Sequence, residues 1–244
     1  MTDSSTSKKE PIKIAVFGSA QEPKELTFYG RIPKKRKLAR DLGEMLGKAF
    51  ENKIEILTGA CIGIPDIVAS EARVHGTRIV GYSGATTLAE HLKNPNYADP
   101  SHLDELKLLT PEERRLNGLA ERSINMIRDA DASIFLGGRT GTLGEYCISL
   151  DGTNKPMYVL RGTGGVISKI PLLNIKKHKG TGRVHKAIDV FDLVYKLDCD
   201  LGIADFTHNP EIQLIFKESG ILQCADRKEY VNWQIDPNKK AIYV

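Results

Sequence analysis

A glycine-rich turn followed by a carboxylate is the stretch of this sequence best suited to chemistry. It runs Gly137-Gly138-Arg139-Thr140-Gly141-Thr142-Leu143-Gly144-Glu145 and follows an apolar segment typical of a buried strand. A strand that ends in such a turn and enters a helix presents free backbone N–H groups, which bind phosphate at the helix N-terminus. Glu145 would lie near the start of that helix. The stretch therefore predicts a site for a phosphorylated ligand with one acid beside it.

Two more small-residue turns follow apolar runs earlier in the chain. Gly18-Ser19 follows residues 12–17, and Thr58-Gly59-Ala60 follows residues 53–57. Ligands of open parallel sheets bind at the carboxyl ends of the strands, so these turns are expected to meet the first one. An alternative is that each turn serves only its own backbone. The residues predicted to bind phosphate or nucleotide are Ser19, Thr58, Gly59, Gly137, Gly138, Arg139, Thr140, Gly141 and Thr142.

The spacing of these glycines excludes two common nucleotide motifs. A P-loop needs GxxxxGK[ST], and a redox dinucleotide site needs GxGxxG; neither pattern fits the turns above. We therefore expect neither a nicotinamide nor a flavin cofactor, and no other cofactor is indicated. The expected ligand is a small phosphorylated nucleotide.

Apolar runs alternate with helix-like segments along most of the chain. Parallel strands need crossover helices, so this alternation predicts an α/β, Rossmann-like three-layer fold with a central parallel sheet. Residues 84–108 lack periodicity and are expected to form a loop that covers the site. Strands are predicted at residues 12–17, 53–57, 78–82, 132–136 and 157–160, and helices from Pro33, over 66–75, over 111–129, over 143–150 and over 187–197.

Three parts of the chain are expected from this pattern. Residues 1–11 are polar and read as a disordered tail, residues 12–185 as the nucleotide-binding domain, and residues 186–244 as a C-terminal extension packed on that domain. The tail has no apolar core to act as a signal peptide, and no apolar run is long enough for a membrane span. We therefore expect a soluble, cytoplasmic protein that does not contact membranes.

Composition and charge restrict the partners further. The 244 residues are 41% hydrophobic and 27% charged, which is ordinary for a soluble globular protein. The four cysteines form no CxxC pair and the six histidines are scattered, so no metal site is expected. The net charge of +4 does not indicate nucleic acid, and the basic runs at residues 34–37 and 176–179 lack interleaved aromatics. Nucleic acid is not expected as a partner.

The segment from residue 121 to Glu145 resembles the LOG ("Lonely guy") family, historically mislabelled lysine decarboxylases. Its motifs are Glu121-Arg122-Ser123-Ile124-Asn125-Met126, Asp129-Ala130-Asp131-Ala132 and the glycine turn described above. Family members carry PGGxGTxxE preceded by an Arg-containing helix, and the resemblance extends over about residues 12–160. It implies a Rossmann-like fold, a homodimer or higher homo-oligomer, and hydrolysis of the N-glycosidic bond of nucleoside 5′-monophosphates to free base and ribose 5-phosphate.

The resemblance also implies roles for single residues. Arg122 and Glu145 fall on the catalytic Arg and Glu of the family, and residues 137–142 fall on its phosphate-binding loop. A carboxylate suits this reaction because it stabilises an oxocarbenium-like state and deprotonates water. A surface position for Arg122, and a helix-dipole role for Glu145, are the plainer alternatives.

This sequence departs from the family pattern at four positions. Gly137 stands where the motif has Pro, Arg139 where it has its second Gly, Ser123 where Lys is common, and Gly144 where an acid is common. The segment at residues 156–165 resembles the molybdenum-cofactor-carrier-like branch of the superfamily, and residues 59–69 resemble DNA-processing proteins. A non-catalytic carrier of a phosphorylated nucleotide or pterin is therefore the second hypothesis, and a DNA-binding protein is a weaker third.

Overall fold

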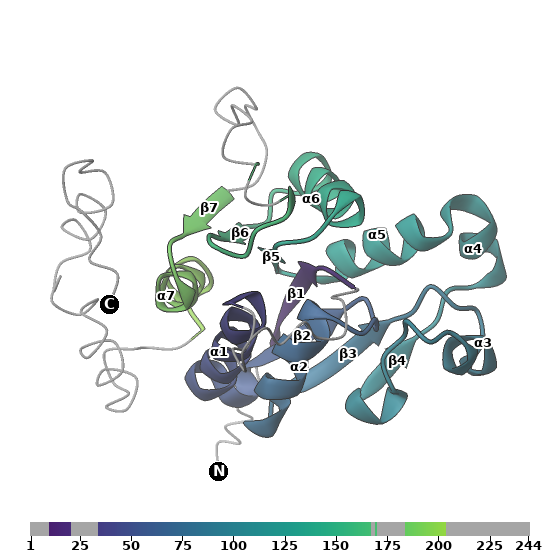
Figure 1. The fold of residues 1–244 in the computed structure, drawn as a ribbon, viewed down its shortest axis with the longest axis horizontal. Coiled ribbons are helices and arrows are strands. Elements are labelled where there is room, and N and C mark those ends of the chain that lie inside the picture. Colours follow the sequence, from purple (N-terminus) through teal and green to yellow (C-terminus); the bar gives the residue numbers. More distant parts are fainter. Residues whose placement is uncertain (1–9, 21–33, 167–168, 170–183, 204–244) are drawn as a thin grey trace, which may run out of the picture. The chain divides into compact units, whose positions relative to one another are not determined.

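The computed structural model describes residues 10–20, 34–166, 169 and 184–203, all within one unit of residues 1–204. Within these residues the centre is a seven-stranded sheet in which every pairing is parallel. The predicted α/β fold is confirmed (Figure 1). The strands are β1 (Ile12–Gly18), β2 (Ile54–Thr58), β3 (Arg78–Tyr82), β4 (Glu105–Lys107), β5 (Ala132–Leu136), β6 (Met157–Leu160) and β7 (Val184–Ala187).

The strand order places a topological switch point at β1. The order is β4-β3-β2-β1-β5-β6-β7, so the chain builds outward from β1 on one side and then returns to build on the other. β1 pairs with β2 through Ile14 and Ile56 and with β5 through Val16 and Ile134. Crevices at such a point, at the carboxyl ends of the strands, are where open α/β sheets bind ligands.

Helices cover both faces of the sheet. Helix α1 contacts both α2 and α7, and α5 and α6 contact one another and the sheet (Figure 1). This is the three-layer arrangement that parallel strands require, because each crossover must pass over a face. The helices are α1 (Lys34–Phe50), α2 (Ile64–Val74), α3 (Leu88–Lys93), α4 (Pro111–Asn117), α5 (Leu119–Asp129), α6 (Thr140–Gly152) and α7 (Val190–Leu201), with 3-10 turns at Glu51–Lys53 and Pro100–His102.

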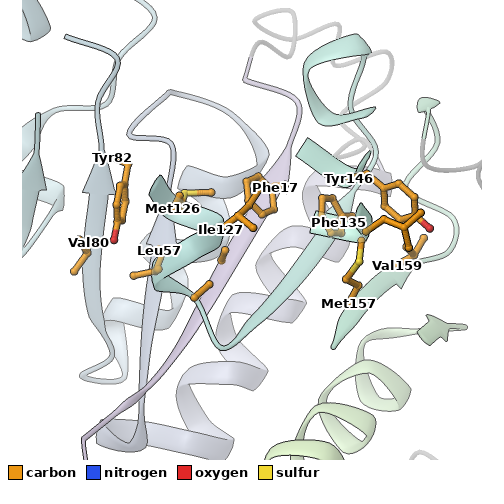
Figure 2. Packing of buried hydrophobic residues seen from close by; sticks show 13 residues of the cluster. Phe17, Leu57, Val80, Tyr82, Met126, Ile127, Phe135, Tyr146, Met157 and Val159 are labelled. Carbon is orange, nitrogen blue, oxygen red and sulfur yellow. The ribbon is translucent and has the colours of Figure 1, made fainter. Parts of the chain in front are cut away.

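The core beneath α5 and α6 is continuous across the sheet (Figure 2). Phe17 of β1 stacks on Phe135 of β5 at a centroid distance of 5.0 Å, and Tyr146 of α6 packs edge-on against Phe135 at 5.3 Å. Met126 and Ile127 of α5 extend the same cluster. Strands buried on both faces read as mostly apolar runs, which is why the sequence located β1, β2 and β5.

Residues 84–129 differ from the prediction in two ways. The predicted helix over 111–129 is two helices, because Gly118 has φ +55° and its backbone separates α4 from α5. The predicted loop at 84–108 contains the short helix α3 and the short strand β4. Thr87 caps α3 by accepting a hydrogen bond from Glu90 N. Elements of six and three residues are too short to show a hydrophobic period.

The sheet extends past the predicted start of the C-terminal extension. Strand β7 spans residues 184–187, pairs with β6, and therefore crosses the expected boundary between residues 185 and 186. Helix α7 follows it and contacts β6, β7 and α1. The sequence missed β7 because Val184-His185-Lys186-Ala187 carries two polar residues among four. The rest of the expected extension, residues 204–244, and residues 1–9 of the expected tail lie outside the described residues.

Candidate functional site

A cavity of about 250 Å³ opens at the switch point, beyond the carboxyl ends of β1, β2 and β5. Its wall comes from the end of β1 and the turn after it, the turn after β2, the first turn of α2, the start of α6 and one side of α5. The parallel fold brings these segments together from distant parts of the sequence. The lining residues are Val16, Phe17, Gly18, Ser19, Ala20, Gly59, Cys61, Pro65, Arg122, Met126, Arg139, Gly141, Thr142 and Glu145.

The turn between β5 and α6 owes its shape to two glycines. Gly137 and Gly138 have φ of +58° and +92°, and a Cβ on Gly138 would lie 2.2 Å from Thr142 Oγ1. Gly137 N donates to Thr163 Oγ1 at 2.8 Å, so the turn after β6 supports the loop. Proline fixes φ near −65°. The motif's proline is therefore incompatible with the conformation at residue 137, and the departure from the family pattern is a real difference in backbone.

The N-terminus of α6 faces the cavity without a side-chain cap. Arg139 is the N-cap residue and has extended backbone, and its side chain makes no capping hydrogen bond. Gly141 and Thr142 of the first turn line the cavity, and Thr142 Oγ1 donates to Gly18 O at 3.2 Å, which joins α6 to the turn after β1. The first N–H groups of a helix have no partner within the helix. This terminus can therefore receive an anion.

Arg122 of α5 crosses to the turn after β2. Its Nη1 donates to Gly59 O at 3.2 Å and to Cys61 Sγ at 3.3 Å. A Cβ on Gly59 would lie 3.2 Å from the Arg122 Cζ, so a glycine there lets the guanidinium approach the backbone. Arg122 Nε is buried without a hydrogen-bond partner among the described residues. A buried donor left open is a feature of sites that a ligand or water completes.

Glu145 lies on the second turn of α6, against Arg122 and Ser123. Ser123 Oγ donates to Glu145 Oε1 at 3.1 Å, and Arg122 Nη2 lies 3.5 Å from the same oxygen. The Glu145 side chain is only 14% exposed. Burial raises the pKa of Glu145 to about 7, although the Arg122 charge and the Ser123 hydrogen bond both lower it. The carboxyl can therefore both accept and release a proton near neutral pH.

Seven of the eleven residues that the sequence singled out line this cavity, among them both members of the Arg122 and Glu145 pair. The other four do not. Thr58 is buried and its Oγ1 accepts from Ala60 N at 3.2 Å, so it serves its own turn. Gly137 and Gly138 shape the loop from behind the cavity, and Thr140 is exposed to solvent.

Several contributors to the site are not among the residues that the sequence singled out. Cys61, Pro65 and Met126 line the cavity, and Ser123 holds Glu145. Met126 follows Arg122 by four positions on one helix, so the helical period alone could have placed it on the same face. Cys61 and Pro65 follow the turn after β2, and nothing in their spacing indicates which way they point.

In the described ranges, no group of three or more His, Cys, Asp or Glu side chains is arranged to hold a metal ion. Within the same residues, no helix has both the length and the apolar character needed to cross a bilayer.

Solved structures with this fold include two molybdenum-cofactor proteins. The structure of TM1055 has a TM-score of 0.60 and 21% identity over 77% of this chain and 99% of its own. The molybdenum cofactor binding protein of Rippkaea orientalis has a TM-score of 0.55 and 17% identity, covering 80% of this chain and 99% of its own. The molybdenum cofactor carrier protein of Chlamydomonas reinhardtii has a TM-score of 0.54 and 18% identity, covering 79% of this chain and 99% of its own.

A DNA-processing protein shares the fold as well. DNA processing protein A of Helicobacter pylori, whose structure concerns single-stranded DNA binding, has a TM-score of 0.52 and 14% identity, with 78% of this chain and 82% of its own covered. Likenesses at these identities establish the fold alone.

No curated protein matches the chain. Residues 11–193 match the SLOG cluster4 family, which confirms the resemblance to LOG-like proteins. The chain belongs to the SLOG cluster4 family.

Proposed function

We propose that the cavity binds a nucleoside 5′-monophosphate and hydrolyses its N-glycosidic bond, releasing free base and ribose 5-phosphate. One observation carries the proposal. Glu145, the only carboxylate among the described residues that line the cavity, is buried, and its pKa is raised to about 7 beside the guanidinium of Arg122. A carboxyl with a pKa near neutrality is suited to general acid–base catalysis, whereas a purely structural carboxylate gains nothing from such a shift.

The cavity offers a different surface to each part of such a ligand. The phosphate would lie at the uncapped N-terminus of α6, where the N–H groups of the first turn and Arg139 attract negative charge. The apolar side chains of Pro65 and Met126 would contact the base. The ribose would then lie between them, with its C1′ within reach of Glu145. Family membership and the likeness to cofactor-binding proteins support a phosphorylated ligand.

The reaction needs only water besides the nucleotide. The C1′–N bond breaks with its electron pair passing to the base, and the oxygen of water bonds to C1′. Glu145 takes the proton of that water and passes it to the departing base nitrogen, so protons balance and Glu145 returns to its carboxylate form. The carboxylate also stabilises the positive charge that develops on the ribose. Arg122, which Gly59 O and Cys61 Sγ hold in place, would bind the ligand's polar groups through its remaining N–H donors.

A panel of nucleoside 5′-monophosphates, read by mass spectrometry for free base and ribose 5-phosphate, tests this proposal. We expect turnover of at least one member, and a loss of about 10²- to 10⁴-fold in the Glu145→Gln variant. Cys147→Ser is the matched control, because Cys147 lies on the same helix but is exposed and away from the cavity. Absence of released base from every member at high enzyme concentration would contradict a hydrolase.

Arg139 favours a second candidate function, a carrier that binds a phosphorylated nucleotide or pterin without cleaving it. This exposed cation lines the cavity where the family motif has glycine. Its charge would bind the phosphate group more tightly, and tighter binding of the ligand does not by itself speed cleavage. A thermal-shift screen tests it, since a ligand at 100 times its Kd adds about 2.7 kcal/mol of stability. Strong stabilisation without released base would favour the carrier, and stabilisation by no phosphorylated compound would contradict both functions.

A further inference from the structure

The two oxygens of Glu145 have different surroundings. Oε1 accepts a hydrogen bond from Ser123 Oγ at 3.1 Å and lies 3.5 Å from Arg122 Nη2. Oε2 has no protein hydrogen bond in the described part of the chain, although Glu145 lines the cavity. A carboxyl held by one oxygen has its other oxygen directed elsewhere, because the two diverge from one carbon. The asymmetry therefore assigns one oxygen to the protein and leaves the other for a ligand.

Ser123 is well placed to hold this arrangement. It follows Arg122 on α5 and is 5% exposed. Its hydroxyl lies between the guanidinium and the carboxyl, since Arg122 Nη2 is 3.5 Å from Ser123 Oγ on one side and Glu145 Oε1 is 3.1 Å away on the other. A serine hydroxyl has one proton to donate, and here the carboxyl receives it. Rotation of the hydroxyl would break this contact, so the Ser123 hydroxyl, the Arg122 guanidinium and the Glu145 carboxyl restrict one another's orientation.

The charges around Glu145 are few. Arg122 of α5 is the only cation within ion-pair distance of it among the described residues. The other titratable groups of the cavity are the thiol of Cys61, whose pKa burial raises and Arg122 partly lowers again, and the guanidinium of Arg139. A neutral donor at residue 123 therefore holds the carboxyl without adding a second positive charge.

We propose that Ser123 is a positioning residue that fixes Oε1 of Glu145 and leaves Oε2 as the oxygen that exchanges a proton with the substrate. Proton exchange with a substrate rests on the proposed function, whereas the contact between Ser123 and Glu145 is a feature of the protein itself. In the hydrolysis, Oε2 takes the proton of the attacking water and gives it to the departing base, while Oε1 stays on Ser123. A lysine, which is common at this position in LOG proteins, would instead place an ammonium on the carboxylate and keep it ionised.

Titration of Glu145 in the protein without ligand tests the proposal directly. Carbon-13 NMR of protein labelled at the glutamate carboxyl follows the resonance, which Glu145→Gln identifies by its loss. We expect Ser123→Ala to raise the pKa of Glu145, because the Ser123 hydrogen bond lowers it, and Ser123→Lys to lower it, because the ammonium favours the carboxylate. Ser123→Thr keeps the hydroxyl and should leave the pKa unchanged. Ser149→Ala removes another buried hydroxyl, one on α6 that has no hydrogen-bond partner among the described residues, and is the matched control.

Kinetics on a cleaved monophosphate give a second readout. Loss of this one hydrogen bond, which comes from an uncharged donor, should lower kcat about three- to tenfold in Ser123→Ala with KM within about twofold, and Ser123→Thr should restore kcat. A Glu145 pKa that is the same in Ser123→Ala and Ser123→Lys as in the wild type would overturn the proposal. Should Ser123→Lys fail to fold, the Ala and Thr pair decides alone. A wild type that cleaves nothing would refute the hydrolase, while the titration would still decide whether Ser123 sets the state of Glu145.

Discussion

Helix α5 contacts one carboxylate, the buried Glu145 of α6, and carries another, the half-buried Asp129, and the two have different surroundings. Near its middle, Arg122 and Ser123 contact Glu145 through a single oxygen, with the guanidinium 3.5 Å away. At its last residue, Asp129 Oδ2 accepts from Tyr82 Oη at 2.6 Å and from Lys107 Nζ at 3.0 Å. Lys107 also lies 4.8 Å from the centre of the Tyr82 ring. Asp129 therefore has two close donors, one of them charged, whereas the only cation beside Glu145 in the described residues is 3.5 Å away.

The pKa of each carboxyl follows from this difference. Burial raises the pKa of Asp129, but the hydrogen bonds from Tyr82 and Lys107 and the lysine charge outweigh burial and leave it below the usual range. Burial raises the pKa of Glu145 to about 7, and its donors only partly offset this. One carboxylate ties β3 and β4 to the end of α5. The other, Glu145, stays protonatable beside a cavity, and a buried carboxyl with a raised pKa in such a place is the better candidate for chemistry.

The largest expected effect that separates the two carboxylates is on stability as a function of pH. Glu145 binds its proton more tightly in the folded protein than in the unfolded chain. Its contribution is therefore full below the ordinary glutamate pKa of 4.5 and is lost as pH rises through about 7. The shift corresponds to about 3 kcal/mol. The free energy of unfolding would be measured with urea from pH 4 to pH 8 in the wild type and in Glu145→Gln. We expect it to fall more with rising pH in the wild type than in the variant, by an amount of that order.

Asp129 should show the opposite sign in the same experiment. Its pKa is lowered, so its contribution is present above the ordinary aspartate pKa of 3.8 and is lost as pH falls through the pKa of the folded protein. The wild type and Asp129→Asn should therefore differ by a constant amount from pH 5 to pH 8 and converge only in acid. Parallel curves for the wild type and Glu145→Gln across pH 4 to 8 would contradict the raised pKa of Glu145.

A smaller effect is expected from removing the charge of Asp129. Asp129→Asn weakens two hydrogen bonds, but Asp129 and Lys107 are 34% and 39% exposed, so we expect a loss of about 1 kcal/mol in unfolding free energy at pH 7. Asp41→Asn is the matched control, since Asp41 pairs with Lys37 on the surface of α1 and should contribute less than about 0.5 kcal/mol. A larger loss from Asp41→Asn than from Asp129→Asn would show that the cluster at the end of α5 is not structural.

The sheet and the position of Arg122 and Glu145 at the cavity could be predicted because each leaves a local pattern. Strands buried on both faces are mostly apolar runs, so both ends of β5 and of β6 were predicted correctly. Glu145 was found because the glycine turn before it has a recognisable composition. Strand β7 and helix α3 were missed, because a sheet edge and a six-residue helix need no apolar period.

The remaining parts of the site depend on contacts between distant segments, which no single sequence shows. Thr163 supports the glycine turn by accepting from Gly137 N, 26 residues earlier in the chain. Ser123 was noted only as a departure from a family pattern, and its contact with Glu145 follows from how α5 and α6 pack. The positive φ of Gly137 likewise could not be read from the sequence, although it explains why proline is absent there.

The smallest effect concerns Arg139, the exposed cation of the same cavity as Glu145. Solvent screens an exposed charge, so Arg139→Ala should weaken adenosine 5′-monophosphate binding only about three- to tenfold, with the effect shrinking as salt rises. Adenosine, which lacks the phosphate, should bind both proteins equally in the same calorimetric titration. Arg161→Ala is the control, because Arg161 is also exposed but lies in the turn after β6 and does not line the cavity. Equal weakening of nucleoside and nucleotide would place Arg139 away from the phosphate, and the partial charge of the α6 N-terminus would then have to hold the anion alone.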